Sequence, residues 1–230
     1  MRSDRPFRLM ACRHGESVGN VARAAAEARG LAEVDVPVRD ADLPLTARGQ
    51  CQAAALGRRI AALPAGERPT RIVASPHRRA LETAEAIVRA GYAGERVAFR
   101  VDARLEPKAF GVLERLTKKG VAERHPHLDA QRRRVGRFHF CPPGGESRCD
   151  VVLRVRDFLA DLRERNDGHR VLVVTHQVVI NALAYLLDGR TDDALARDDD
   201  GHVPNARLCT YALAAPATVD VHDERTAIAV

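Results

Sequence analysis

Short apolar runs alternate along this chain with longer segments of helical periodicity. Strands are predicted at residues 7–12, 71–74, 97–101, 171–174 and 208–213, with a weaker candidate at 217–222. Helices are predicted at about 46–63, 77–90, 148–165 and 177–187. Strands that alternate with helices are typical of βαβ units, which build parallel sheets. We therefore predict an α/β fold with three layers, α/β/α, around a mostly parallel central sheet.

The length of the chain suits one large α/β domain. We predict that residues 1–230 form a single domain. The segment 104–146 lacks a strong strand pattern and holds a short helical stretch at 117–125 and the basic run Arg132-Arg133-Arg134. Loops of this length inside a compact domain are usually functional or disordered. We interpret the segment as an insertion that crosses the carboxyl edge of the sheet and shapes a pocket.

Charge and cysteine usage exclude several classes of protein. The net charge is +6, but acidic and basic residues are interspersed, so a solvated or substrate-facing basic loop is favoured over a nucleic-acid groove. A positive field would attract phosphorylated small molecules. Five cysteines without a Cys-x-x-Cys pair argue against a disulfide framework and against a zinc site. The run Asp198-Asp199-Asp200 is predicted as an exposed loop, and a metal role for it is disfavoured.

Targeting and membrane signals are weak in this sequence. The first six residues precede no apolar segment long enough for a signal peptide, and no stretch approaches transmembrane length. We therefore expect a soluble, reduced, cytoplasmic protein without a membrane or nucleic-acid partner. Association into a homo-oligomer stays open.

Histidines and arginines gather at the predicted ends of strands. His14, with Arg13 beside it, follows the first strand, and His176 follows the fourth strand. The second strand leads into Arg78 and Arg79. Ligands of open parallel sheets bind outside the carboxyl ends of the strands. Two histidines and at least two arginines at this edge predict an anion site, most simply a phosphate site.

The residue types suit phosphoryl transfer. Arginine meets phosphate oxygens with two parallel hydrogen bonds, and a histidine can act as the nucleophile if it is neutral. Nearby arginines disfavour the protonated imidazole. Gly15, directly after His14, lets the backbone approach an anion closely, and a helix beginning soon after it would add free N–H groups.

Five motifs in a fixed order carry a resemblance to a known family. They are Arg13-His14-Gly15-Glu16-Ser17 with Asn20, Leu43-Pro44-Leu45-Thr46-Ala47-Arg48-Gly49 with Gln52-Ala53, Ser75-Pro76 with Arg79-Ala80 and Thr83-Ala84, Gly144-Gly145-Glu146-Ser147 with Arg154 and Phe158, and Val174-Thr175-His176. Together they resemble the histidine phosphatase superfamily, the phosphoglycerate-mutase-like proteins. The similarity covers nearly the whole chain.

The resemblance implies roles for single residues and a reaction without metal or cofactor. His14 would be the phosphorylated nucleophile, and Arg13, Arg79 and His176 would complete the pocket around the phosphoryl group. The residues implied to contact substrate are Arg13, Ser17, Asn20, Arg79, His176 and Gln177. Arg78 competes with Arg79 for one role, and the Arg-Ala pair favours Arg79.

The remaining histidines are predicted on the surface or in loops. They are His77, His125, His127, His139 and His169. His139 lies between Phe138 and Phe140 and is, among these, the candidate for contact with substrate.

Two positions depart from the family pattern. The family commonly places a glutamate general acid four residues before the glycine of a Phe-Gly pair, where this chain has Pro107 ahead of Gly111. Glu106 stands one residue early, and a residue before proline is held in extended backbone, which tends to turn its side chain away. Either a local bulge brings Glu106 into the site, or the usual proton donor is missing. Gln177 replaces a common glycine and adds a polar side chain at the pocket rim.

These residues favour a metal-independent phosphomonoester hydrolase. The expected substrate is a small phosphate ester, with a phosphoprotein as the alternative. A cofactor-dependent phosphoglycerate mutase needs the same pocket, but its glutamate is displaced here and its flanking tryptophans are missing. A phosphate-binding protein of the same fold with little catalytic activity is the third reading.

Overall fold

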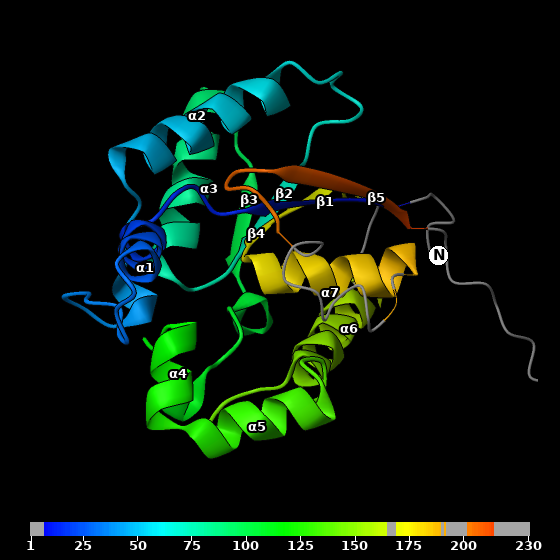
Figure 1. The fold of residues 1–230 in the computed structure, drawn as a ribbon. Coiled ribbons are helices and arrows are strands. Elements are labelled where there is room, and N and C mark those ends of the chain that lie inside the picture. The colour runs from blue at the N-terminus through cyan, green and yellow to red at the C-terminus, as the bar shows by residue number, and fades with distance from the viewer. Residues whose placement is uncertain (1–6, 165–168, 190, 192–201, 214–230) are drawn as a thin grey trace, which may run out of the picture.

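A computed structural model describes residues 7–164, 169–189, 191 and 202–213 (Figure 1). Its sheet has five strands in the order β3-β2-β4-β1-β5. They are β1 Phe7–Arg13, β2 Arg71–Ala74, β3 Ala98–Val101, β4 Val171–Thr175 and β5 Leu208–Leu213. All neighbours pair in parallel except β1 and β5, which are antiparallel. The predicted, mostly parallel sheet is confirmed, while the weak candidate at 217–222 lies outside the described residues.

The described helices reproduce every predicted helix to within a few residues. They are α1 Val18–Ala28, α2 Ala47–Ala61, α3 Arg78–Gly91, α4 Lys118–Arg124, α5 Pro126–Val135, α6 Arg148–Glu164 and α7 Gln177–Asp188. Short 3-10 helices are η1 Asp40–Asp42, η2 Ala103–Leu105 and η3 Gly111–Leu113. No helix in these stretches of chain is long and apolar enough to cross a membrane.

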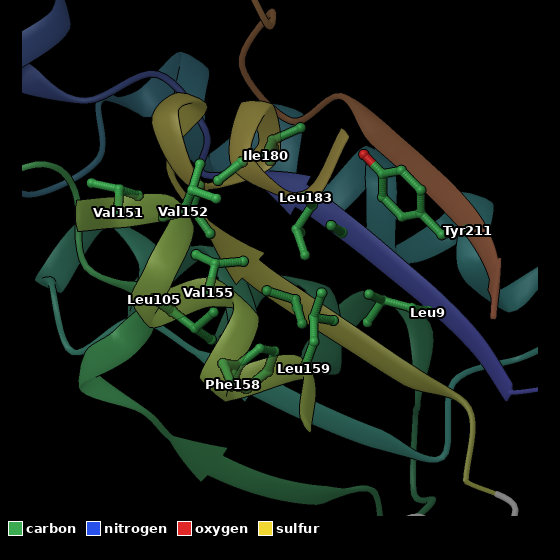
Figure 2. Packing of buried hydrophobic residues seen from close by; sticks show 14 of the residues in the cluster. Leu9, Leu105, Val151, Val152, Val155, Phe158, Leu159, Ile180, Leu183 and Tyr211 are labelled. Atoms are coloured by element: carbon green, nitrogen blue, oxygen red, sulfur yellow. The ribbon is translucent and has the colours of Figure 1, made fainter. Parts of the chain in front are cut away.

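Side chains that point alternately to opposite sides of each strand form the two faces of the sheet. In β1, Leu9 and Ala11 pack with α6 and α7, whereas Met10 and Cys12 pack with α2 and α3. Successive side chains of a strand point to opposite faces, so a strand buried on both faces reads as a continuous apolar run. Figure 1 shows the sheet between these two pairs of helices, and Figure 2 shows Phe158 and Leu159 of α6 in one cluster with Leu9 of β1. The predicted α/β/α layering is confirmed.

The segment between β3 and α6 is helical, and its basic run is not a loop. Arg132, Arg133 and Arg134 form part of α5, at the bottom of Figure 1. Arg132 Nη2 lies 2.7 Å from Asp129 Oδ1, and Arg133 pairs with the other oxygen of this buried carboxylate. Ion pairs three and four residues apart stabilise a helix, which the charge run alone did not indicate. The Asp198-Asp199-Asp200 loop lies outside the described residues.

Two glycines let the turn after β1 touch the start of α2. A Cβ atom on Gly15 would lie 2.4 Å from the carbonyl oxygen of Gly49, and one on Gly49 would lie 2.0 Å from that of Glu16. Both contacts are with backbone atoms, so relieving either overlap would require the main chain itself to shift. The bare backbone at these positions therefore fixes where the turn carrying His14 sits against α2.

Replacing Gly49 with alanine is expected to destabilise the protein by roughly 2–3 kcal/mol, because the added methyl group overlaps a backbone oxygen. Urea unfolding measures the change. The matched control is Gly66→Ala, where an added Cβ meets nothing within 4 Å. Equal stability of the two variants would contradict the contact between the turn and α2.

Candidate active site

His14 stands at the end of β1 and is buried, with 4% of its surface exposed. Its backbone N–H donates to the carbonyl oxygen of Thr175 at 2.9 Å, which ties the turn to the end of β4. Its Nδ1 lies 2.7 Å from the carbonyl oxygen of Gly15. A carbonyl only accepts, so Nδ1 carries the proton and Nε2 keeps a free lone pair. Burial first, then Arg79, lowers the pKa of His14 to about 3, which keeps the ring neutral.

His176 lies directly after β4, next to His14. The two ring centroids are 5.1 Å apart in an edge-on arrangement. His176 Nε2 lies 2.9 Å from the hydroxyl oxygen of Ser75, at the end of β2. Burial lowers the pKa of His176, and His14 and Arg79 lower it further. The sheet edge thus brings together residues from β1, β2 and β4, as the sequence predicted.

Arg13 extends from the last residue of β1 toward the start of α7. Its Nη1 donates to Gln177 Oε1 at 3.2 Å and to the carbonyl oxygen of Val203 at 2.5 Å. Gln177, predicted at the pocket rim, is thus a partner of Arg13. Burial, and after it the charge of Arg79, lowers the pKa of Arg13. Positive charge from two arginines at one sheet edge favours an anion there.

Arg79 is the buried arginine of the pair at the start of α3. Its side chain is 7% exposed, whereas that of Arg78 is 57% exposed and pairs with Glu82. The Arg79 guanidinium holds Asp40 at two points, through Nη2 to Oδ2 at 2.8 Å and through Nη1 to the carbonyl oxygen at 2.5 Å. The structure therefore places Arg79 with the histidines, in agreement with the prediction.

His77 lies in the loop ahead of α3, one of the two settings predicted for it, but it is not on the surface. Its side chain is 11% exposed, and its Nε2 lies 3.5 Å from Asp40 Oδ2. Its ring centroid is 5.2 Å from that of His176. The predicted helix at 77–90 included His77, but α3 begins at Arg78, and His77 lies in the turn that follows β2 at the same sheet edge as the site. His77 thus belongs to the cluster of His14, His176 and Arg79.

Ser17 and Asn20 form the cap of α1 next to the site. The Asn20 N–H donates to Ser17 Oγ, and the Ser17 N–H donates to Asn20 Oδ1. Such a capping box satisfies two N–H groups at the helix start. Asn205 Nδ2 donates to Asn20 Oδ1 and to the carbonyl oxygen of His14, both at 3.1 Å. The cap of α1 is thus tied through Asn205 to the turn that carries His14. Contact of Ser17 and Asn20 with substrate stays a prediction.

Glu106 lies at the end of η2, with extended backbone at φ −62° and ψ 157°. Its carbonyl oxygen accepts from Arg154 Nη2 at 2.9 Å. The preceding carbonyl, of Leu105, accepts from Thr175 Oγ1 at 2.7 Å, so the segment runs beside the end of β4. Within the described part of the chain, the Glu106 carboxylate forms no hydrogen bond with the site residues. The extended backbone expected ahead of Pro107 is present, and the role of Glu106 stays open.

Thr83 connects the turn after β1, which carries His14, with the first turn of α3, which carries Arg79. Its hydroxyl donates to the carbonyl oxygen of Arg79 at 2.6 Å and accepts from the N–H of Gly15 at 3.1 Å. One buried side chain of α3 therefore sets the position of both the His14 turn and the first turn of α3. The sequence placed Thr83 in a motif without a role. Ser75 likewise stood in a motif without a role of its own. Asp40 and Asn205 were missed altogether, because no local pattern marks a single polar residue that meets the site only in the folded chain.

The low pKa values of His14 and His176 predict a loss of stability in mild acid. Unfolded histidine has a pKa of about 6.5, and both folded values lie below it. Their contribution is therefore complete above about pH 6.5 and is lost as the pH falls toward the folded values, because only the unfolded chain then binds protons. We expect the free energy of unfolding to fall by roughly 1 kcal/mol per pH unit for each histidine below about pH 6.

Urea unfolding between about pH 6.5 and pH 5 measures this slope, above the range in which most carboxylates titrate. The His14→Gln variant should show a shallower slope than the unaltered protein. Identical slopes would contradict the neutral, buried state of His14.

The fold is an α/β sheet whose carboxyl edge gathers two arginines and three histidines. The chain belongs to the histidine phosphatase superfamily, because residues 9–215 match the profile of branch 1 of this superfamily. This confirms the family that the motifs indicated. The match covers every residue of the site, from Arg13 to Asn205.

Relatives carry both phosphatase and mutase names. The chain is 31% identical over 182 residues to phosphoglycerate mutase-like protein AT74H of Arabidopsis thaliana, which covers 75% of this chain and 57% of that protein. It is 33% identical over 154 residues to the probable phosphoglycerate mutase GpmB of Salmonella paratyphi C, covering 64% of this chain and 65% of that protein. The chain thus spans less than two thirds of the length of these curated relatives.

A solved structure supports the same class. The mycobacterial glucosyl-3-phosphoglycerate phosphatase Rv2419c superposes with a TM-score of 0.68 at 26% identity, and the match covers 90% of each chain. The family and this neighbour support an enzyme of the phosphatase or mutase type.

Proposed function

We propose that this protein is a metal-independent phosphomonoester hydrolase that works through a phosphorylated His14. The observation that carries the proposal is the state of His14: a buried, neutral ring whose Nε2 lone pair is free because Nδ1 is held by the Gly15 carbonyl. Arg13 and Arg79 supply fixed positive charge beside this nucleophile. Phosphoryl transfer needs positioning and charge neutralisation more than covalent help from the protein.

The proposed reaction has two steps. Nε2 of His14 attacks phosphorus, an N–P bond forms, and the P–O bond to the leaving group breaks. Arg13, Arg79 and His176 hold the phosphoryl oxygens. In the transition state the negative charge is spread over these oxygens, and the three side chains stabilise it there. The leaving group departs with the electron pair of the P–O bond and takes a proton from solvent. Water then attacks phosphorus and gives up a proton to solvent, the N–P bond breaks, and inorganic phosphate leaves with His14 returned to its neutral form. The proton on Nδ1 stays in place throughout.

The test is phosphate release from p-nitrophenyl phosphate in excess EDTA. We expect phosphate release that EDTA does not reduce. Rapid quenching of the reaction should also trap phosphorylated enzyme, whose bound phosphate is labile to acid and stable to alkali, as in a phosphoramidate. Activity lost in EDTA and restored by a divalent cation would overturn the metal-independent mechanism. Absence of any release would favour the mutase or the phosphate-binding reading.

The names of the relatives keep the mutase as a second candidate. A mutase would transfer the phosphoryl group from His14 to a second hydroxyl and would need a bisphosphorylated primer. With 3-phosphoglycerate and such a primer, isomerisation faster than hydrolysis would identify it. Hydrolysis faster than isomerisation supports the phosphatase.

The position of Glu106 predicts a strong dependence on the leaving group. Without a positioned proton donor, aryl phosphates should be hydrolysed about 100-fold faster than alkyl phosphates, since general acid catalysis contributes about that much or more. Glu106→Gln should then change the rate for aryl phosphates little, as should the control Glu114→Gln in the same segment. Glu106 would be established as the general acid if the rate of hydrolysis did not change with the pKa of the leaving group and if Glu106→Gln, but not Glu114→Gln, abolished activity.

A further inference from the structure

Asp40 fills the guanidinium fork of Arg79. Its Oδ2 accepts from Nη2 at 2.8 Å, and its carbonyl oxygen accepts from Nη1 at 2.5 Å. Both terminal nitrogens of the arginine are thus engaged by oxygens of one residue. The same Oδ2 lies 3.5 Å from His77 Nε2. One anionic oxygen therefore sits between two donors of the site.

This arrangement resembles the way in which arginine binds a phosphoryl group. A guanidinium offers two parallel N–H groups, which carboxylate and phosphate oxygens accept in the same geometry. The position of Asp40 Oδ2 therefore marks a place where Arg79 and His77 would together hold a phosphoryl oxygen. An incoming phosphate ester and the Asp40 carboxylate cannot both occupy it.

Asp40 is held in a way that allows exchange. Arg79 is anchored in α3 with a side chain 7% exposed, whereas the Asp40 side chain is 46% exposed on the three-residue helix η1. Water can solvate the half-exposed Asp40 carboxylate when it leaves, whereas the buried Arg79 guanidinium then needs another anionic oxygen in its place. Desolvation opposes ionisation of Asp40, but its interactions with His77 and Arg79 lower its pKa overall, so the side chain stays an anion at neutral pH.

We propose that Asp40 is an internal competitor for the phosphate site: its carboxylate occupies an oxygen position on Arg79 and His77, and a phosphate ester binds by displacing it. This inference rests on the proposed function, because it takes Arg79 as part of the phosphoryl site. The competition weakens the binding of the substrate and of the product phosphate alike. Asp40 thereby limits inhibition by product, and His77 becomes a fourth contact of the phosphoryl group.

The test measures inorganic phosphate binding by calorimetry, in parallel with its inhibition constant wherever the protein shows turnover. Asp40→Asn keeps the size and the hydrogen-bonding oxygen but removes the charge. We expect this variant to bind phosphate about tenfold more tightly, as for loss of a partly buried opposing charge. The matched control is Asp42→Asn on the same short helix, since Asp42 pairs with Arg39 and should leave phosphate binding unchanged.

A second pair of variants separates competition from mere positioning of Arg79. In an Arg79→Gln background, adding Asp40→Asn should no longer tighten phosphate binding, because the shared site is gone. Phosphate binding by Asp40→Asn that is equal to or weaker than that of the unaltered protein would overturn the competition. Thermal unfolding confirms that each variant is folded.

The two proposals fail in different ways. If the unaltered protein binds phosphate but Asp40→Asn gives no gain, only the competition is wrong. If neither the unaltered protein nor Asp40→Asn binds phosphate, the pocket is not a phosphoryl site, and both proposals are wrong.

Discussion

Replacement of His14 with glutamine is expected to reduce hydrolysis of p-nitrophenyl phosphate by at least about 1000-fold, since losing the nucleophile of a cooperating set removes most of its rate enhancement. Glutamine retains an amide N–H that can donate to the Gly15 carbonyl, but it has no lone pair able to attack phosphorus. The turn after β1 should therefore keep its position while the covalent step is lost. Steady-state kinetics and the acid-quench assay for phosphorylated protein measure the two effects.

The matched control is His127→Gln. His127 lies in the first turn of α5 and is exposed, so its loss should leave the rate unchanged. Phosphate binding by the His14→Gln variant should persist, because Arg13 and Arg79 remain. A variant that keeps a tenth or more of the rate, measured on a folded sample, would contradict the assignment of His14 as nucleophile.

The central strands could be predicted from sequence because burial on both faces leaves a continuous apolar run, as in β4, where all five residues are buried. The runs at 71–74 and 208–213 match β2 and β5 at both ends. The basic run of α5 gave no such signal, since its helix buries little apolar surface and depends on ion pairs with Asp129. Pairing of this kind becomes visible only when the residues of the helix are seen together.

The centre of the site was equally predictable, for a topological reason. Parallel strands end at one edge, so Arg13, His14 and His176 had to meet there once β1 and β4 were neighbours. Asp40 could not be predicted in this way. It reaches Arg79 from a loop 39 residues earlier in the chain, and the position of that loop depends on tertiary packing that no local pattern describes.

Arg79→Lys is expected to lower kcat/KM for phosphate esters by about 100-fold or more, although the charge is kept. An ammonium group offers donors from one point and cannot hold two oxygens in parallel, as the guanidinium of Arg79 holds the two oxygens of Asp40. The loss should fall mainly on kcat if the fork tightens on the transition state, and mainly on KM if it only binds the ground state.

Arg78→Lys provides the matched control for this prediction. Arg78 is the next residue along α3, carries the same charge and pairs with Glu82 on the exposed side of the helix. Its substitution should change kcat/KM by less than about twofold, as for a surface ion pair. If Arg78→Lys were the damaging variant and Arg79→Lys the silent one, the phosphoryl contact would lie on the other face of α3. Since adjacent helical residues point about 100° apart, the pair of variants decides which face carries the site.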